Sequence, residues 1–250
     1  MGIFSKLFGT AKGADAPVEH RLESLRRPCW IPVVEEGDGD TTASKLCGIP
    51  YLRPDEAWPV CPNCGKPIQL FVQLNSEDLP DKCGKPWGDG LLQFFYCTTT
   101  EPLCEVDCAA WGPHSKSTLL RVIEADEDGS RYETSPISEP FPAKLITGWN
   151  EQDDLPNWEE LQKLGLDLPE SRPEELSGTF PHEGERLLGW PAWVQGVEYP
   201  SCRQCNSRMQ LLFQIDSNKN IPIWFGDAGI GHITQCPVHK TELAFGWACS

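Results

Sequence analysis

The organisation of this chain is clearest in the segment Cys61-Pro62-Asn63-Cys64-Gly65-Lys66-Pro67-Ile68-Gln69-Leu70-Phe71-Val72-Gln73-Leu74. A Cys-x-x-Cys turn passes directly into an apolar segment that has the composition of a β-strand. The same unit returns as Cys202-Arg203-Gln204-Cys205-Asn206-Ser207-Arg208-Met209-Gln210-Leu211-Leu212-Phe213-Gln214-Ile215. The second copy follows the first by 141 positions (202 − 61), and no gap is needed from Leu46 to Asn75. We therefore expect an internal duplication.

The match between the two copies continues beyond this first strand. Residues 90–97, which are almost entirely apolar, match residues 229–236 at an offset of 139 positions (229 − 90). The 23 prolines and 22 glycines favour many turns and short strands over long helices. We predict an α+β, strand-rich fold in which two pseudo-two-fold related repeats form one compact globule with short helices.

Four segments follow from this pattern. Residues 1–44 are predicted to form an N-terminal extension with a short helix, and residues 45–148 the first repeat with a zinc site. Residues 149–184 read as a helical linker with a helix at 155–165 and a helical turn at 173–176, and residues 185–250 as the second repeat with a zinc site. We interpret the acidic run at 151–154 as solvated surface or a helix cap.

The charge of the chain limits the classes of partner that it can bind. The formal net charge is −16 and the isoelectric point about 4.7. Such a surface repels phosphate backbones and anionic lipids, so we expect no nucleic acid and no membrane as partners. A basic protein is the electrostatic complement, although acidity also serves solubility alone. The oligomeric state is not indicated by the sequence.

The number and pairing of the cysteines bear on the cellular compartment of the protein. The chain has 12 cysteines, and residues 1–8 lack the apolar core and cleavage site of a secretory signal. No stretch approaches the ~18 apolar residues of a membrane span. We expect a cytoplasmic protein with reduced thiols, where paired cysteines bind metal more often than they form disulfides.

The second half contains a complete set of metal ligands. Cys202 and Cys205 form a Cys-x-x-Cys knuckle, and Cys236 and His239 follow in a Cys-x-x-His arrangement after the matched strand. Zinc prefers four such ligands in a tetrahedron, with two from each turn. We predict a closed zinc site here, which stabilises the fold and leaves no position for a catalytic water.

The first half lacks a histidine at the matching position, which falls near Thr100. Cys61, Cys64 and Cys97 are the predicted ligands of a second zinc ion, and Cys104 is the predicted fourth, with Cys108 as the alternative. Buried structural cysteines and redox-active Cys-x-x-Cys pairs are the competing interpretations. The remaining cysteines follow no ligand pattern; they are Cys29, Cys47, Cys83 and Cys249.

Two other patterns admit alternative interpretations. Gln69 and Gln73, and Gln210 and Gln214, are spaced four apart in the strands, so they could line a groove or form local hydrogen bonds. The glycine-rich segment 226–232 precedes a strand and not a helix, so it predicts a tight turn and not a phosphate site. No catalytic triad or paired-carboxylate motif stands out in the sequence.

Several short motifs of this sequence resemble those of known families. They are Gly48-Ile49-Pro50, Trp58-Pro59, Cys61-Pro62-Asn63-Cys64-Gly65, Gln73-Leu74, Gly90-Leu91-Leu92-Gln93-Phe94-Phe95-Tyr96, Gln214-Ile215-Asp216-Ser217 and Gly226-Asp227. From about residue 45 onward the chain resembles the bacterial YwqG-like family of uncharacterised proteins, in a cysteine-rich form. It is also similar, mainly in its first half, to the eukaryotic programmed-cell-death-2 proteins through Pro50, Cys61, Cys64, Gly65, Gln73, Phe95, Cys97 and Cys104.

The resemblance implies an α+β, strand-rich, two-fold repeated fold, and no established reaction for the bacterial family. The eukaryotic relatives resemble dedicated chaperones of a basic ribosomal protein, which suits a chain with a net charge of −16. The sequence therefore favours a non-enzymatic, zinc-stabilised protein-interaction module that binds a basic partner, of chaperone or immunity type. The alternative is a metal-dependent enzyme with an open zinc site.

Overall fold

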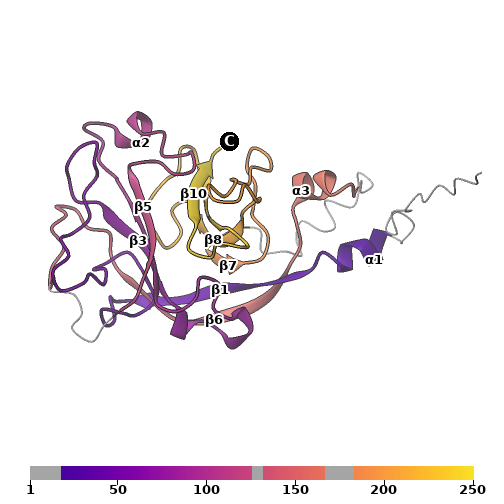
Figure 1. Ribbon diagram of the computed structural model, residues 1–250, viewed down its shortest axis with the longest axis horizontal. Coiled ribbons are helices and arrows are strands. Elements are labelled where there is room, and N and C mark those ends of the chain that lie inside the picture. The colour runs from indigo at the N-terminus through magenta and orange to yellow at the C-terminus, as the bar shows by residue number, and fades with distance from the viewer. Residues whose placement is uncertain (1–17, 126–131, 167–182) are drawn as a thin grey trace, which may run out of the picture.

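The computed structural model describes residues 18–125, 132–166 and 183–250 (Figure 1). The predicted helical turn at 173–176 lies outside these residues. The strands are β1 (Arg27–Glu36), β2 (Lys45–Leu46), β3 (Gln69–Asn75), β4 (Leu91–Tyr96), β5 (Thr118–Ile123), β6 (Lys144–Asp154), β7 (Arg186–Leu188), β8 (Gln210–Asp216), β9 (Ile230–Gln235) and β10 (Leu243–Ala248). The helices are α1 (Val18–Glu23), α2 (Cys104–Asp107) and α3 (Trp158–Lys163), with single 3₁₀ turns at Ser76–Asp78 and Asp81–Cys83. The described chain is therefore strand-rich with short helices, as predicted.

All ten strands belong to one antiparallel sheet, in the order β10-β9-β8-β7-β1-β6-β2-β3-β4-β5. The long strands β1 and β6 are central in this order and run together along the lower part of Figure 1, with β3 and β5 to the left and β7, β8 and β10 near the middle. The sheet curls so far that its last strands, β5 and β10, contact each other. Trp247 on β10 donates from Nε1 to the hydroxyl of Tyr96 on β4 over 3.2 Å, which links the two ends.

The main core fills the inside of this curl. Phe94 of β4 and Phe245 of β10 have ring centroids 4.2 Å apart, although their strands lie near opposite ends of the sheet order. Phe71, Tyr96 and Phe225 pack around them. Each buried aromatic ring contributes about 2–3 kcal/mol of hydrophobic free energy, so the cluster resists opening of the curl.

A β-bulge in β3 directs one strand to two different interiors. The register with β4 shifts between Leu70 and Val72. Phe71 and Val72 both pack into the main core, whereas Leu70 packs with Phe95 against a group of cysteines. A bulge has this effect because it inserts an extra residue and so breaks the alternation of side chains.

The boundaries of several elements differ from the sequence predictions. The predicted helix at 155–165 is shorter, since α3 spans Trp158–Lys163 behind an Asn157 cap. The acidic run at 151–154 is the end of β6 and not a helix cap; residues 151–153 are exposed, as the solvated-surface interpretation predicts, whereas Asp154 is fully buried. The strand β6 also runs across residue 148, where we expected the first repeat to end. In the described parts of the chain, no helix has the length and apolar character needed to cross a membrane.

Candidate metal centres

The first Cys-x-x-Cys segment folds into a tight hydrogen-bonded turn before β3. The Gly65 N–H donates to the Cys61 carbonyl over 2.7 Å, and the Cys61 N–H donates to the Lys66 carbonyl over 2.9 Å. Gly65 has φ +71°, a left-handed conformation that glycine adopts without steric cost. The turn thereby places the Cys61 and Cys64 side chains on the same side.

The second Cys-x-x-Cys segment makes the same turn before β8. The Asn206 N–H donates to the Cys202 carbonyl over 2.8 Å, and the Cys202 N–H donates to the Ser207 carbonyl over 2.9 Å. Asn206 takes the place of the glycine at φ 59°, and asparagine is among the few other residues that tolerate this region. The two cysteine pairs are therefore presented in equivalent local geometry.

Four cysteines meet beside the first turn. Cys97 follows β4 and Cys104 begins α2, and each lies opposite one member of the pair. The Sγ atoms of Cys61 and Cys104 are 3.8 Å apart, as are those of Cys64 and Cys97. All four sulfurs lie within 4.8 Å of one another, and Cys108 is not in the group.

Three cysteines and a histidine meet beside the second turn. The Sγ atoms of Cys205 and Cys236 are 3.6 Å apart, and His239 Nδ1 lies 3.7 Å from Cys202 Sγ and 3.8 Å from Cys236 Sγ. The four ligand atoms again lie within 4.8 Å of one another. The structure thus brings together each of the two sets of four residues predicted from sequence, and either set can hold a metal ion.

The sulfur spacings separate metal ligation from disulfide bonding. Bonded disulfide sulfurs lie ~2.05 Å apart, and every one of the 12 cysteines is a free thiol. Backbone donors point at the ligand sulfurs: the Gln204 N–H is 3.4 Å from Cys202 Sγ, and the His239 N–H is 3.2 Å from Cys236 Sγ. Such donors stabilise thiolates, the form in which cysteine binds metal.

The protein environment raises the pKa of some thiols and lowers the pKa of others. Burial raises the pKa of Cys97 and of Cys104. Burial also acts against ionisation of Cys64, but hydrogen bonds from the Lys66 backbone and the Thr99 hydroxyl lower its pKa to about 7. Hydrogen bonds from the Ser207 side chain and backbone lower the pKa of Cys205 to about 6. Each cluster therefore contains one thiol that ionises readily near neutral pH.

The two clusters differ in exposure. In the first, three of the cysteines are buried and only Cys64 is partly exposed. In the second, Cys205 is exposed and His239 partly so. Val238, between Cys236 and His239, has 65% of its surface exposed, so the second cluster lies close to solvent.

Two ion pairs with a buried basic side chain were missed by the sequence analysis. Lys45 Nζ donates to Asp38 Oδ1 over 2.6 Å, with the lysine side chain only 1% exposed. Arg186 Nη1 lies 3.4 Å from Asp154 Oδ2, and both side chains are fully buried. A signal was available, because Arg186 follows Lys45 by the same 141 positions (186 − 45) that separate the cysteine turns.

The glutamines in the strands hold loops in place. Gln73 Oε1 accepts from the Tyr51 N–H over 2.8 Å, and Gln214 Oε1 accepts from the Ala192 N–H over 2.9 Å. Gln73 also donates to the Ala43 carbonyl, and Gln214 to the Gly184 carbonyl. Of the two interpretations of these residues, local hydrogen bonding is the one observed for Gln73 and Gln214.

The fold and the two clusters define a cysteine-rich antiparallel β protein with two candidate metal centres. Residues 44–244 match a domain of unknown function (DUF1963), and the chain belongs to this family. No curated protein gives a significant match to the sequence.

Proposed function

We propose that this protein is a duplicated, zinc-stabilised, cytoplasmic interaction module that binds a basic protein partner. The observation that carries the proposal is the pair of four-ligand clusters in a chain with a net charge of −16.

Recurring local features support the duplication. The bulge at Leu70/Val72 in β3 has a counterpart at Leu211/Phe213 in β8. Left-handed residues recur at the same offset, with Cys47 and Gly48 matched by Leu188 and Gly189; their φ angles are 60°, 81°, 60° and 79°. Isolated bridges beside the two cysteine turns also match; they are Val60 with Pro67 and Ser201 with Arg208.

The strand order gives a further argument for the duplication. The strand β1 lies between β6 and β7, and β6 lies between β1 and β2. If β1–β5 and β6–β10 are the two repeats, each pairs its second strand with the first strand of the other. The dyad then passes between β1 and β6, which pair along their full lengths from Arg27 with Asp154 to Glu36 with Lys144.

The donor sets favour zinc. Two sulfurs bound ~2.3 Å from a tetrahedral zinc ion lie roughly 3.8 Å apart, and the paired sulfurs of the clusters are 3.6 to 3.8 Å apart. Cys₄ and Cys₃His are typical sets for structural zinc. Since four protein ligands fill a tetrahedral shell, no position is left for a substrate, and this supports a stabilising role over the enzymatic alternative.

The charge favours a basic partner. Acidic and basic surfaces attract each other over about one Debye length, which speeds encounter and selects against acidic partners. The likeness of the first half to the programmed-cell-death-2 proteins supports a chaperone-like role. Reduced thiols are required by both clusters, and this supports the cytoplasm as the compartment.

Two measurements on the purified full-length chain test the proposal. Elemental analysis should find two zinc ions per chain, with about eight ligand groups protected from thiol reagents or protons until a chelator is added. Native pull-down at low salt should recover a stoichiometric basic protein that dissociates as salt is raised. A metal-free chain with freely titrating thiols contradicts the zinc assignment, and repeated failure to recover a partner at low salt contradicts the interaction. A toxin gene beside this one would favour the immunity type over the chaperone type.

A further inference from the structure

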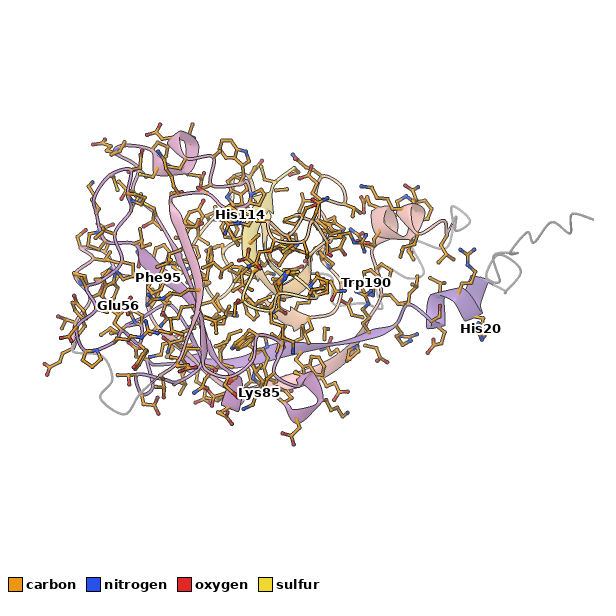
Figure 2. All side chains as sticks on the ribbon, in the orientation of Figure 1. His20, Glu56, Lys85, Phe95, His114 and Trp190 are labelled. Atoms are coloured by element: carbon orange, nitrogen blue, oxygen red, sulfur yellow. The ribbon has the colours of Figure 1, made fainter. Side chains whose placement is uncertain are left out.

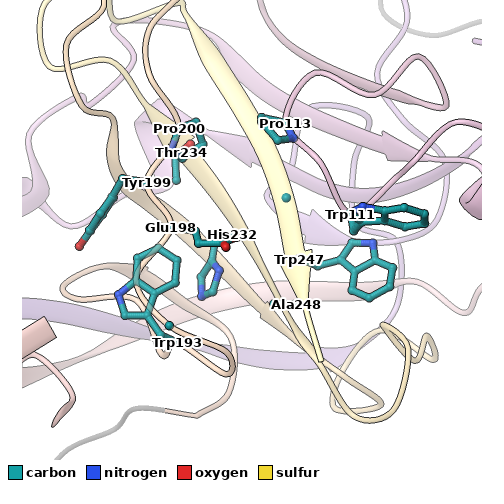
Figure 3. A pocket seen from close by; sticks show the side chains of 12 residues that line it. Trp111, Pro113, Trp193, Glu198, Tyr199, Pro200, His232, Thr234, Trp247 and Ala248 are labelled. Atoms are coloured by element: carbon teal, nitrogen blue, oxygen red, sulfur yellow. The ribbon is translucent and has the colours of Figure 1, made fainter. Parts of the chain in front are cut away.

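A pocket of about 350 Å³ opens where β9 and β10 meet the loop that carries Trp111 (Figure 3). In Figure 3, Trp193, Tyr199 and His232 lie on one side of β10, and Trp111 and Trp247 on the other. The carboxylate of Glu198 is also part of the lining. The pocket thus combines aromatic walls, one imidazole and one acid, and neither metal cluster contributes to it.

His232 has an unused acceptor in this pocket. The side chain is only 6% exposed, and Nε2 has no hydrogen-bond partner among the described residues. Burial, reinforced by the charge of Arg186, lowers the pKa of His232 to about 3, while a hydrogen bond to the backbone of Ala192 opposes this shift. The imidazole is therefore neutral at pH 7, and with one nitrogen bonded to Ala192 the other is available as an acceptor.

The walls of the pocket are held in place by hydrogen bonds. Glu160 Oε2 accepts from the Trp193 indole N–H and from the Tyr199 hydroxyl, each over 2.8 Å. The indole N–H of Trp247 donates to the Tyr96 hydroxyl, and its backbone N–H donates to the Trp111 carbonyl over 3.1 Å. Because the walls are already fixed, their side chains lose little conformational entropy when a ligand binds.

In the first half of the chain, an arginine side chain occupies the position that corresponds to this pocket. Gln93 lies in β4 where His232 lies in β9, at the 139-residue offset of these strands (232 − 93). Its Oε1 accepts from Arg121 Nε over 2.9 Å. The Arg121 guanidinium also pairs with Glu56, and its central carbon lies 5.7 Å from the ring centroid of Phe95. Glu56 and Phe95 are labelled in Figure 2. A guanidinium therefore binds there against an acceptor, a carboxylate and an aromatic ring.

The second half has no such arginine. Arg121 lies directly opposite Gln93 in the sheet, whereas the residue opposite His232 is Gly246. A Cβ at position 246 would come within 2.9 Å of the Trp111 carbonyl, so the strand cannot supply a side chain at this point. An acceptor, a carboxylate and aromatic rings also line this pocket, supplied from other positions by His232, Glu198 and Trp193, while β10 supplies no guanidinium opposite His232.

We propose that this pocket receives an arginine side chain of the basic partner, in the way that Arg121 occupies the corresponding place in the first half. The inference rests on the proposed function and names the group that the partner inserts. The guanidinium donates to His232 Nε2, stacks on the indole rings and lies near Glu198. A neutral acceptor beside a carboxylate suits a charged planar donor better than an anion or an apolar group.

Capped arginine, titrated into the zinc-loaded full-length protein, tests this assignment. The probe is N-acetyl-arginine methylamide, and the readout is the NMR shift of the Trp193 and Trp247 indole N–H signals. We expect saturable binding with a dissociation constant in the millimolar range. The matching citrulline compound, which keeps the shape but lacks the charge, should bind about tenfold more weakly, and the lysine compound should also be weaker. Shifts that do not saturate, or equal binding of citrulline or lysine, overturn the proposal.

Two variants of His232 provide the matched control. His232→Gln keeps an acceptor and copies the residue of the first half, so binding should stay within about threefold of wild type. His232→Leu keeps the volume but removes the acceptor, so binding should fall about tenfold. Circular dichroism and thermal melting establish that both variants fold. Equal binding by the two folded variants would mean that His232 Nε2 does not contact the ligand.

The inference and the proposed function fail in different ways. If a basic partner is recovered equally by wild type and by a folded His232→Leu variant, the function stands and the arginine site is wrong. If capped arginine binds as expected but no basic partner is found, the site stands and the function is wrong.

Discussion

Arg186 Nη1 lies 3.4 Å from Asp154 Oδ2 in a place where neither side chain has any exposed surface. The same carboxylate oxygen accepts from the Trp190 N–H over 2.6 Å. Gly189 allows this approach, because a Cβ there would come within 2.5 Å of that oxygen. Burial raises the pKa of Asp154 and lowers that of Arg186, and the attraction between the two charges opposes both shifts. The Trp190 backbone bonds both partners, since its carbonyl accepts from Arg186 Nη2.

Replacement of Arg186 by methionine should strongly destabilise the protein. The change leaves the Asp154 carboxyl buried without its cation, which typically costs about 3–5 kcal/mol. Urea unfolding followed by tryptophan fluorescence at neutral pH measures the loss. The neighbouring pair of Arg26 and Asp153, 3.9 Å apart and with the aspartate 69% exposed, is the control. Arg26→Met should cost less than about 1 kcal/mol, and equal losses for the two variants would contradict the argument.

The two cysteines near α2 should differ in their effect on metal content. Cys104→Ser should lower the zinc content from two ions per chain to about one, because Cys104 Sγ is one of the four clustered sulfurs. Cys108→Ser should leave the content unchanged, because this cysteine lies outside the cluster. Elemental analysis after gel filtration distinguishes them. Retention of both ions by Cys104→Ser would remove this residue from the site.

Whether a feature of the fold or of the metal clusters was predicted depends on how far apart in the sequence the interacting residues lie. The cysteine turns and the strand at 69–75 were predictable, because a Cys-x-x-Cys spacing and an apolar run are local patterns. The grouping of Cys97 with Cys61 and Cys64 was also predicted, since Cys97 matches Cys236 at the 139-residue offset. No matched ligand position indicated Cys104, which was predicted as a cysteine further along the same loop.

The interactions that the sequence analysis missed are long-range ones. The length of β6 and the burial of Asp154 depend on pairing with β1 and on Arg186, 32 residues away. The composition of residues 151–154 does not distinguish a fully exposed run from a strand end whose last carboxylate pairs with a buried cation. The pocket at His232 likewise depends on a residue opposite in the sheet, Gly246, which no local pattern links to it.

A chelator should remove the two metal ions at different rates. The second cluster contains the exposed Cys205, whereas in the first only Cys64 is partly exposed. Release to a chromophoric chelator should therefore be biphasic, with the faster phase from the second cluster. Cys205→Ser should abolish the fast phase, and Cys64→Ser the slow one. A fast phase that persists in Cys205→Ser would mean that exposure does not control release.

Acid should destabilise the protein through His232 more than through a glutamine at the same position. The folded-state pKa of His232 is lowered to about 3 by burial, so the folded protein does not take up the proton that unfolded histidine binds near pH 6.5. The stability that neutral His232 preserves is present above pH ~6.5 and is lost as pH falls towards ~3. Between about pH 7.5 and about pH 5.5, wild type should lose about 1 kcal/mol more than His232→Gln in urea unfolding. Parallel pH profiles for the two proteins would contradict the assignment of a neutral buried imidazole.

Removal of Arg121 should create in the first half the kind of space that the second half already has. Arg121→Ala deletes the bond to Gln93 and the pair with Glu56, so the free energy of unfolding should fall by about 1–3 kcal/mol. Methylguanidine should recover part of the loss, because it can donate to the same acceptors. At about ten times its dissociation constant it would restore about 1.4 kcal/mol. Methylurea, which has a similar shape without charge, is the matched control. Thermal melting of the variant with each compound gives the answer, since rescue by methylguanidine alone shows that the fold binds a guanidinium between these strands. Equal effects of the two compounds would remove the internal precedent on which the arginine site at His232 depends.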